Sequence, residues 1–388
     1  MTKLNSHIDT TGGIPENAAG GILHIDLDAL ASNWRILRDR AGGAQTAAVV
    51  KANAYGTGIE NAVPALGRAG CDTFFVAHLS EAIRVRAVAP GAAIYVLNGL
   101  FSGTCPTYAE FDLRPVLGSF EEIAEWAGFC RAKGRKLKAA IHVDTGMNRL
   151  GLTVPQGLTL KDRAELKDFE TALLMSHFVS AEESDNPLNR QQIEAFQAVR
   201  ATLPGIPASL ANSSGLFLKD KPHFDLARPG YALYGGNPTP DQANPMKPVV
   251  GLEARIVQLR WVEADHTVGY NGRWLALEKR RIATLSVGYA DGYPRSSSAR
   301  GKSGEELLAG MALVAGRPCT FAGNVSMDLI TIDVTDVPAS QIQRGDTVTL
   351  IGGDLSIDEV GRRAGTIGYE ILTNLGPRYA RAYRGGRG

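Results

Sequence analysis

The 388-residue sequence has few cysteines and no long apolar run. Its four cysteines show no C-x-x-C spacing, which argues against a zinc site or a disulfide framework and favours reduced thiols: Cys71, Cys105, Cys130 and Cys319. No apolar run approaches the ~18 residues that cross a bilayer, and residues 1–20 lack the apolar stretch of a signal peptide. The sequence therefore predicts a cytoplasmic protein that has no membrane partner.

An excess of positive charge is also lacking, since 41 Lys and Arg face 40 Asp and Glu. Without a net positive field, nucleic acid is not an expected partner. No G-x-G-x-x-G joins a strand to a helix and no Walker motif occurs, so a nucleotide cofactor is not expected either. His177 has no carboxylate or second histidine at ligand spacing, and we therefore predict no metal site.

Residues 21–245 alternate short apolar runs with longer helix-like segments, after a polar leader over residues 1–20. Eight runs read as strands, at residues 47–50, 73–77, 93–97, 113–117, 138–143, 172–176, 208–211 and 224–227. Eight strand–helix units of this length predict a closed parallel (β/α)8 barrel. An open, doubly wound sheet is the alternative.

Residues 246–388 change to short alternating apolar runs without intervening helices. This pattern is typical of an antiparallel β domain. The predicted boundary falls in the proline-rich stretch 235–248. The predicted fold class is therefore α/β, with an N-terminal (β/α)8 barrel followed by a C-terminal, mainly antiparallel β domain.

Polar residues follow most of the eight runs, where barrel enzymes carry their active sites. They are Lys51, His78, Asn98, the turn 144–149, His177, the group 212–214 and Arg228. An ammonium at the end of a buried strand is costly unless it is paired, whereas a neutral amine there is a nucleophile. A lone lysine at such a place is more often salt-bridged. However, the Ser- and Gly-rich turns after the last two strands suggest phosphate binding, and a lysine facing a phosphate site suggests pyridoxal phosphate.

Several blocks of the sequence resemble the alanine racemase family and occur in the order typical of it, within residues 24–384. They are AVVKANAYGTG (48–58), DTGMNRLG (144–151), SHF (176–178), ANSSG (211–215), RPGYALYG (228–235), VGYNGRW (268–274), SVGYADGYPR (286–295), VSMDL (325–329) and TIGYEILT (366–373). The resemblance implies an enzyme that interconverts L- and D-alanine with pyridoxal phosphate. It also implies a homodimer with shared active sites.

By position, the resemblance implies that Lys51 binds the cofactor as an imine and acts as one base, while Tyr270 of the partner subunit acts as the other. Arg228 would face the pyridine nitrogen, with His177 bonded behind it. The phosphate would be held by Tyr55, Ser214, Gly230, Tyr231 and Tyr369. On the substrate side, Met327 of the partner subunit would bind the carboxylate through its N–H, with Arg149 assisting. Asp328 would also belong to the substrate side, and Tyr289 would narrow the entrance.

One departure from the family concerns residue 142, where many members carry a lysine understood to be carbamylated and to orient the arginine. This chain has His142, which cannot supply that anion. A pyridoxal-phosphate amino-acid decarboxylase of similar architecture is the nearest alternative, with Cys319 as its proton donor. A racemase for serine or a broader amino-acid set, and a non-catalytic carrier of the cofactor, are further alternatives. A biosynthetic and a catabolic alanine racemase would use the same residues, so both roles stay open.

Overall fold

The computed structural model describes residues 15–305 and 308–386, which divide into two compact units. Residues 28–247 together with 386 form the barrel unit, and residues 15–27 together with 248–385 form the β unit. Among the described residues, no helix is long and apolar enough to cross a membrane.

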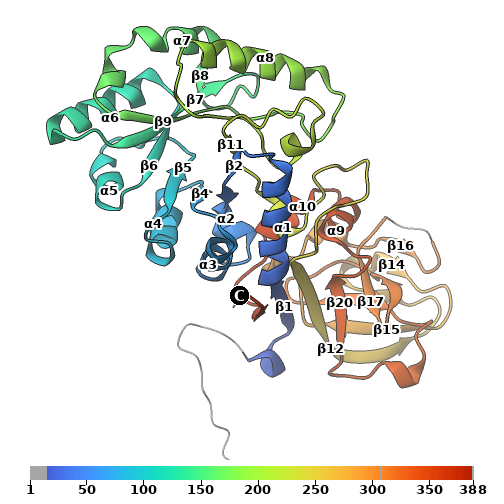
Figure 1. The fold of residues 1–388 in the computed structure, drawn as a ribbon. Helices are drawn as coiled ribbons and strands as arrows, with labels where there is room; N and C mark the ends of the chain where they lie inside the picture. The colour runs from blue at the N-terminus through green and yellow to red at the C-terminus, as the bar shows by residue number, and fades with distance from the viewer. Residues whose placement is uncertain (1–14, 306–307, 387–388) are drawn as a thin grey trace, which may run out of the picture. The chain divides into compact units, whose positions relative to one another are not determined.

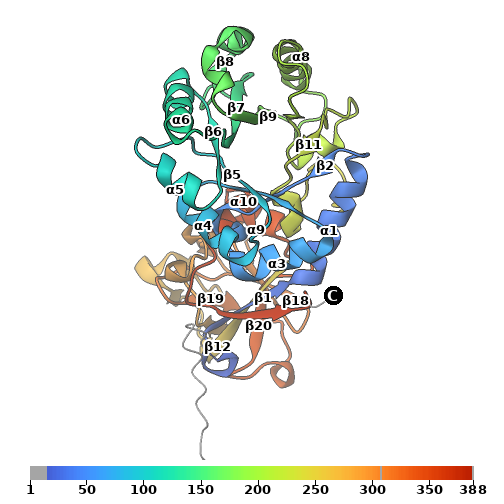
Figure 2. The same cartoon turned by 60° about the vertical axis from the view of Figure 1, so that its left-hand side comes forward.

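The barrel unit is a ring of parallel strands (Figures 1 and 2). In chain order these strands are β2 (Gln45–Thr46), β3 (Ala48–Val49), β4 (Thr73–Val76), β5 (Ala93–Val96), β6 (Arg114–Leu117), β7 (Lys138–Asp144), β9 (Glu170–Met175), β10 (Ala208–Ser209) and β11 (Leu226–Ala227). A short strand, β8 (Leu152–Thr153), pairs with β7 outside the ring. Each of the eight predicted runs corresponds to a position in this ring.

Single backbone hydrogen bonds close the ring on both sides of β11. Arg228 N–H donates to the Ala211 carbonyl (2.9 Å) next to β10. On the other side, Ala47 N–H donates to the Ala227 carbonyl (2.9 Å) and Val49 N–H to the Pro229 carbonyl (2.9 Å). The predicted barrel is thus confirmed over the open sheet.

Helix α1 (Leu27–Arg40) precedes the first ring strand. Helices also follow most of the ring strands, namely α2 (Lys51–Tyr55), α3 (Ile59–Ala69), α4 (Leu79–Val88), α5 (Cys105–Glu110), α6 (Phe120–Lys133), α7 (Val154–Leu158) and α8 (Pro187–Ala201). The sequence of α6 shows why. Ser119 caps its N-terminus by accepting from Glu122 N–H (3.2 Å), and Gly134 ends it in the left-handed conformation. Ile123, Trp126, Ala127 and Cys130 recur at helical spacing and form its buried face.

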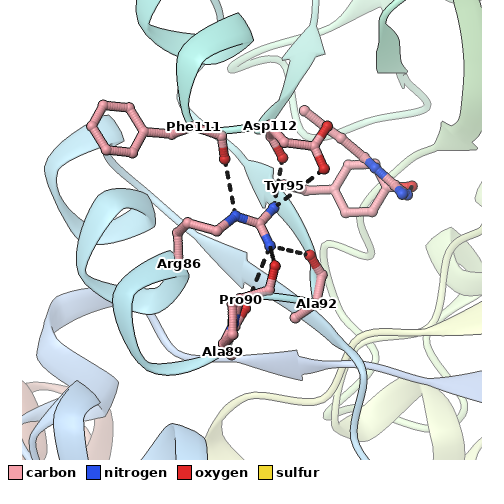
Figure 3. Close-up of polar contacts among 8 residues, drawn as sticks. Arg86, Ala89, Pro90, Ala92, Tyr95, Phe111 and Asp112 are labelled. Atoms are coloured by element: carbon pink, nitrogen blue, oxygen red, sulfur yellow. Dashed lines mark hydrogen bonds and ion pairs between the residues drawn. The ribbon is translucent and has the colours of Figure 1, made fainter.

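Arg86 joins the end of α4 to the loop that follows α5 (Figure 3). Its guanidinium donates to the carbonyls of Phe111 (2.9 Å), Asp112 (2.6 Å), Pro90 (2.8 Å), Ala92 (2.8 Å) and Ala89 (3.4 Å). The Asp112 carboxylate lies 3.8 Å away. A cation is well placed there because the carbonyls beyond a helix C-terminus lack intrahelical partners.

The β unit is mainly antiparallel, as predicted. Its strands are β1 (Gly21–Asp26), β12 (Val250–Val262), β13 (Thr267–Val268), β14 (Trp274–Leu275), β15 (Arg280–Leu285), β16 (Gly301–Lys302), β17 (Met311–Val314), β18 (Arg317–Thr320), β19 (Ile330–Asp333), β20 (Thr347–Ile351) and β21 (Ala380–Arg384). Two helices, α9 (Ile357–Arg363) and α10 (Gly368–Thr373), complete it.

The first strand differs from the sequence-based division of the chain. Residues 21–26 were assigned to the barrel, but β1 pairs antiparallel with β12 and parallel with β21. Residues 15–20, part of the predicted loose leader, are also held in this unit, where Arg255 donates to the carbonyls of Ala19 (3.2 Å) and Glu16 (2.9 Å). Residues 1–14 of the predicted leader lie outside the described residues.

Candidate active site

Lys51 stands two residues after β3, at the carboxyl end of the barrel strands. Within the described residues, its Nζ has no hydrogen-bond or ion-pair partner. Burial lowers the pKa of the amine below its ordinary value, and the nearby Arg149 cation lowers it further, while Glu81 opposes the shift. These surroundings favour the neutral, nucleophilic amine that the sequence analysis expects at this position.

The four residues after Lys51 form a left-handed turn without any glycine. Their φ angles are 51° at Ala52, 55° at Asn53, 54° at Ala54 and 50° at Tyr55. Left-handed backbone costs an L-residue roughly 1–2 kcal/mol, so consecutive examples persist only when surrounding contacts hold them. Sequence reasoning missed this turn, because neither alanine nor tyrosine favours positive φ.

Arg228 follows β11 and is a buried cation without a carboxylate partner among the described residues. Its guanidinium donates to the Ser209 hydroxyl and to the Ser176 carbonyl (2.6 Å), rather than to the His177 ring as the resemblance implies. Burial lowers its pKa to about 9, which still leaves it charged at neutral pH. A buried and unpaired positive charge at a strand end favours an electron-rich acceptor in the ligand.

Two histidines near Arg228 are held neutral. Burial, assisted by the Arg228 charge, lowers the pKa of His177 to about 3 and that of His142 to about 4. His142 therefore supplies no anion toward Arg149, as its residue type predicts. The carbonyl of His177 accepts from the Gln192 amide (2.9 Å), which also donates to Thr145 (3.1 Å) and so ties together the loops after β7 and β9.

Hydroxyl groups surround Gly230, in the turn after β11. A Cβ atom added to Gly230 would lie 2.5 Å from Tyr55 Oη, so only glycine allows this close approach. Tyr55 stacks on Tyr234 with ring centroids 4.6 Å apart. The Ser213 hydroxyl accepts from the N–H groups of Gly230 (3.1 Å) and Ala232 (3.2 Å).

Ser213 was not singled out among the phosphate-binding residues, although it lies in the quoted ANSSG block. Its neighbour Ser214, which was singled out, begins a short 3-10 turn and is buried, as is Tyr231. The serine-rich spacing indicated a polar turn. Only the folded backbone determines which of the two hydroxyls faces Gly230.

Arg149, predicted on the substrate side, lies in the barrel unit, in the loop between β7 and β8. The remaining predicted residues lie in the β unit, where several large apolar and aromatic side chains are exposed. The exposed side chains are Tyr270 (71%), Ile367 (61%), Met327 (54%), Leu329 (42%) and Tyr289 (41%). Asn324 donates to the Tyr270 carbonyl (3.0 Å), which fixes the Tyr270 turn beside the segment that carries Met327. Tyr369 lies in α10.

Met327 lies at the tip of a turn in which Ser326 and Leu329 bond to each other. Within the described part of the chain, Met327 N–H has no acceptor, so it can bind an anionic group of a ligand. Its carbonyl accepts from Ala290 N–H (3.0 Å), and this bond joins the turn to the loop that carries Tyr289.

An ion-pair network that sequence reasoning missed supports the Met327 turn. Arg378 contacts the buried Asp291 (3.1 Å) and also the Asp328 carboxylate (2.9 Å). Asp291 in turn accepts from Gly288 N–H (2.8 Å). Asp291 lies in the quoted SVGYADGYPR block, but its partner Arg378 stands far away in the sequence.

Comparison with known proteins decides the family. The N-terminal domain model of alanine racemase matches residues 25–238, and the C-terminal domain model matches residues 249–383. This chain belongs to the alanine racemase family. It is 58% identical to an alanine racemase of Methylobacterium sp. (strain 4-46), over 94% of this chain and 98% of that protein.

Solved alanine racemases have the same fold. The crystal structure of alanine racemase from Bartonella henselae with covalently bound pyridoxal phosphate matches with a TM-score of 0.88 and 38% identity, covering 94% of this chain and 100% of that one. A second relative, the alanine racemase of Methylobacterium nodulans, is 57% identical over 99% of this chain and 98% of its own.

Two points from the sequence analysis remain, namely Cys319 as a proton donor and a metal site. Cys319 is buried in β18, and burial raises the pKa of its thiol to about 12, which makes it a poor proton donor to a solvent-accessible site. The described residues contain no cluster of three or more His, Cys, Asp or Glu side chains that could hold a metal ion.

Proposed function

We propose that this chain is an alanine racemase that binds pyridoxal phosphate at Lys51 and uses Lys51 and Tyr270 of the partner subunit as its two bases. The observation that carries the proposal is the pair formed by Lys51 and Arg228 on the same ring of strand ends. Within the described residues, the Lys51 amine has no partner and a lowered pKa, and the buried Arg228 cation has no carboxylate partner. Family membership supports the same assignment.

The donor set of the barrel unit fits pyridoxal phosphate. Lys51 is suited to the aldehyde carbon, and Arg228 is suited to the ring nitrogen. The hydroxyl groups of Tyr55 and Ser214, with the backbone N–H groups of Gly230 and Tyr231, are suited to the phosphate, and Tyr369 of the β unit is proposed to join them. When bound, the cofactor withdraws electrons from the amino-acid Cα and so acidifies its proton.

Arg228 determines how strongly that withdrawal acts. A guanidinium keeps its proton at every physiological pH, so Arg228 would donate a hydrogen bond to the ring nitrogen of the cofactor and leave it unprotonated. Electron withdrawal from Cα would then be weaker. We expect this to favour return of a proton to Cα over transamination.

Racemisation requires a proton to leave one face of Cα and another to arrive on the opposite face. Lys51 would take the proton on one face as the neutral amine, or deliver it there as the ammonium. Tyr270 of the partner subunit serves the other face. A large aromatic side chain that is 71% exposed in its own chain suits a residue that functions in another subunit.

Alanine is the proposed substrate. Arg149 and the backbone N–H of Met327 of the partner subunit would hold its carboxylate, with Asp328 keeping the Met327 turn in place through Arg378. The exposed side chains of Tyr270, Tyr289, Met327, Leu329 and Ile367 would form part of the surface covered in a homodimer. Tyr289 would narrow the entrance, which disfavours larger amino acids.

Mixed dimers test the shared site. Lys51→Ala and Tyr270→Phe homodimers should each be nearly inactive, because each site lacks one base. Refolding the two variants together should restore activity, because one site of each heterodimer then joins an intact Lys51 to an intact Tyr270 from the other chain. A chiral assay with alanine and serine would measure the activity.

Heterodimers that are demonstrably present but no more active than their parents would refute the shared site. As a control, refolding Lys51→Ala with itself should restore nothing. Preferred turnover of serine over alanine would instead contradict the proposed substrate while leaving the two-base arrangement intact.

A further inference from the structure

We propose that Glu81 is a positioning residue for Lys51, which acts by holding the left-handed turn 52–55 in place. This inference rests on the proposed role of Lys51. It assigns a role to a carboxylate that was not among the residues singled out in the sequence.

Glu81 lies in the first turn of α4, and its carboxylate accepts three backbone N–H groups from two loops. Oε1 accepts from Asn53 (3.2 Å), in the middle of the left-handed turn. Oε2 accepts from Ala77 (3.0 Å) and His78 (3.2 Å), in the loop between β4 and α4. One side chain thus ties the loop after the Lys51 strand to the loop after its neighbour in the ring.

A second group of contacts supports Asn53 from its side chain. Arg84, one turn further along α4, donates to Asn53 Oδ1 (2.7 Å) and forms a two-bond pair with Glu60 (2.7 and 2.8 Å). Asn53 Oδ1 also accepts from Ile59 N–H (3.3 Å), at the start of α3. Residues of both α3 and α4 therefore form hydrogen bonds with Asn53 and hold it in place.

These hydrogen bonds are needed to hold the turn, because its backbone conformation is intrinsically unfavourable. Residues 52–55 all have positive φ and none is glycine, so the chain leaves this conformation when the acceptor for Asn53 N–H is removed. Lys51 stands at one end of the turn and Tyr55, which lies against Gly230, at the other. A change in the turn would displace both residues at once.

The charge of Glu81 acts on Lys51 as well. It attracts the ammonium form and opposes the lowering of the Lys51 pKa by burial and Arg149. The carboxylate therefore limits how far the amine is driven toward its neutral form, in addition to fixing its backbone.

Glu122 offers a matched control on another strand end of the same barrel. It also lies in the first turn of a helix, α6, and it accepts loop N–H groups from Leu100 (2.9 Å) and Gly118 (2.5 Å). It forms no hydrogen bond with residues 51–55 in the described part of the chain. Replacing Glu122 removes the same kind of contact without touching the left-handed turn.

The test compares Glu81→Ala with Glu122→Ala in three measurements: amide hydrogen exchange of the apoprotein, pyridoxal-phosphate affinity by absorbance titration, and steady-state racemisation of alanine. For Glu81→Ala we expect faster exchange over residues 52–56, at least tenfold weaker cofactor binding and a roughly 10²-fold lower kcat with little change in KM, since a misplacement of about 1 Å has that effect. Glu122→Ala should speed exchange near residues 100 and 118 only.

Relief of backbone strain supplies a second test. Ala52 is exposed and has a φ of 51°, which glycine adopts freely. Adding Ala52→Gly to Glu81→Ala should recover part of the lost cofactor affinity, whereas adding it to Glu122→Ala should change nothing. A role of Glu81 in general stability alone predicts no such rescue.

The inference is overturned if Glu81→Ala matches Glu122→Ala in cofactor affinity and kcat, or if exchange over residues 52–56 is unchanged. A different result would refute the proposed function, namely a wild-type protein that binds no cofactor at Lys51 or racemises no alanine. The exchange measurement on the apoprotein tests in either case whether Glu81 holds the turn in place.

Discussion

Gly230 is the position where the backbone after β11 passes closest to the Tyr55 hydroxyl, and Gly230→Ala tests whether this closeness matters. The new Cβ would lie 2.5 Å from Tyr55 Oη, 3.2 Å from Tyr55 Cζ and 3.4 Å from Val49 Cβ. Real Cβ atoms do not approach an oxygen at 2.5 Å, so Tyr55 or the backbone at residue 230 must move.

Tyr55 has little room to give way. It is buried, its ring stacks on Tyr234 at 4.6 Å, and Tyr234 is held by a hydrogen bond to the Val49 carbonyl (3.1 Å). Overpacking at a site of this kind costs about 1–3 kcal/mol in the free energy of unfolding. Because Tyr55 and Gly230 are both proposed to face the phosphate, cofactor affinity should fall as well.

The assay is urea unfolding of the apoprotein followed by far-ultraviolet circular dichroism, paired with cofactor titration. Gly67→Ala is the matched control, because Gly67 lies inside α3 and a Cβ there meets nothing within 4 Å. It should raise the free energy of unfolding by about 0.5–1 kcal/mol through helix propensity and leave cofactor affinity unchanged.

A double-mutant cycle with Tyr55→Phe isolates the contact. Removing Oη leaves Cζ, at 3.2 Å, as the closest Tyr55 ring atom to the new Cβ. Gly230→Ala should therefore cost less stability in the Tyr55→Phe background than alone. An equal cost in both backgrounds, or no cost in either, would refute the steric reasoning.

Two further predictions concern Cys319 and His142. Cys319→Ser should keep racemisation within a few-fold of wild type, because a buried thiol with a raised pKa is a poor proton donor; a loss of roughly 10²-fold with intact circular dichroism would revive the decarboxylase alternative. Burial holds the pKa of His142 at about 4, below the 6.5 of an unfolded chain, so the unfolded state binds more protons between these values and stability falls as the pH drops from 6.5 toward 4. His142→Asn should make unfolding free energy less dependent on pH in that window, by up to about 1.4 kcal/mol per pH unit, and an unchanged slope would show that His142 is not held neutral.

The sequence alone determined the features that depend on neighbours along the chain. The spacing of apolar runs predicted every strand position of the barrel, because strand and helix periods are local properties. The rule that barrel sites lie at strand ends then singled out Lys51, His177 and Arg228 without any coordinates. The change of pattern after residue 248 indicated the β domain for the same reason.

Only the tertiary structure decided which distant residues meet. Residues 21–26 were assigned to the barrel, yet they form β1, which pairs with β12 and β21, whose residues are hundreds of positions away. Arg378 reaches Asp291 and Asp328, and Glu81 reaches Asn53, for the same reason. The left-handed turn 52–55 is locally unfavourable for its own residues. It forms because long-range contacts to α3 and α4 offset the free-energy cost of left-handed backbone.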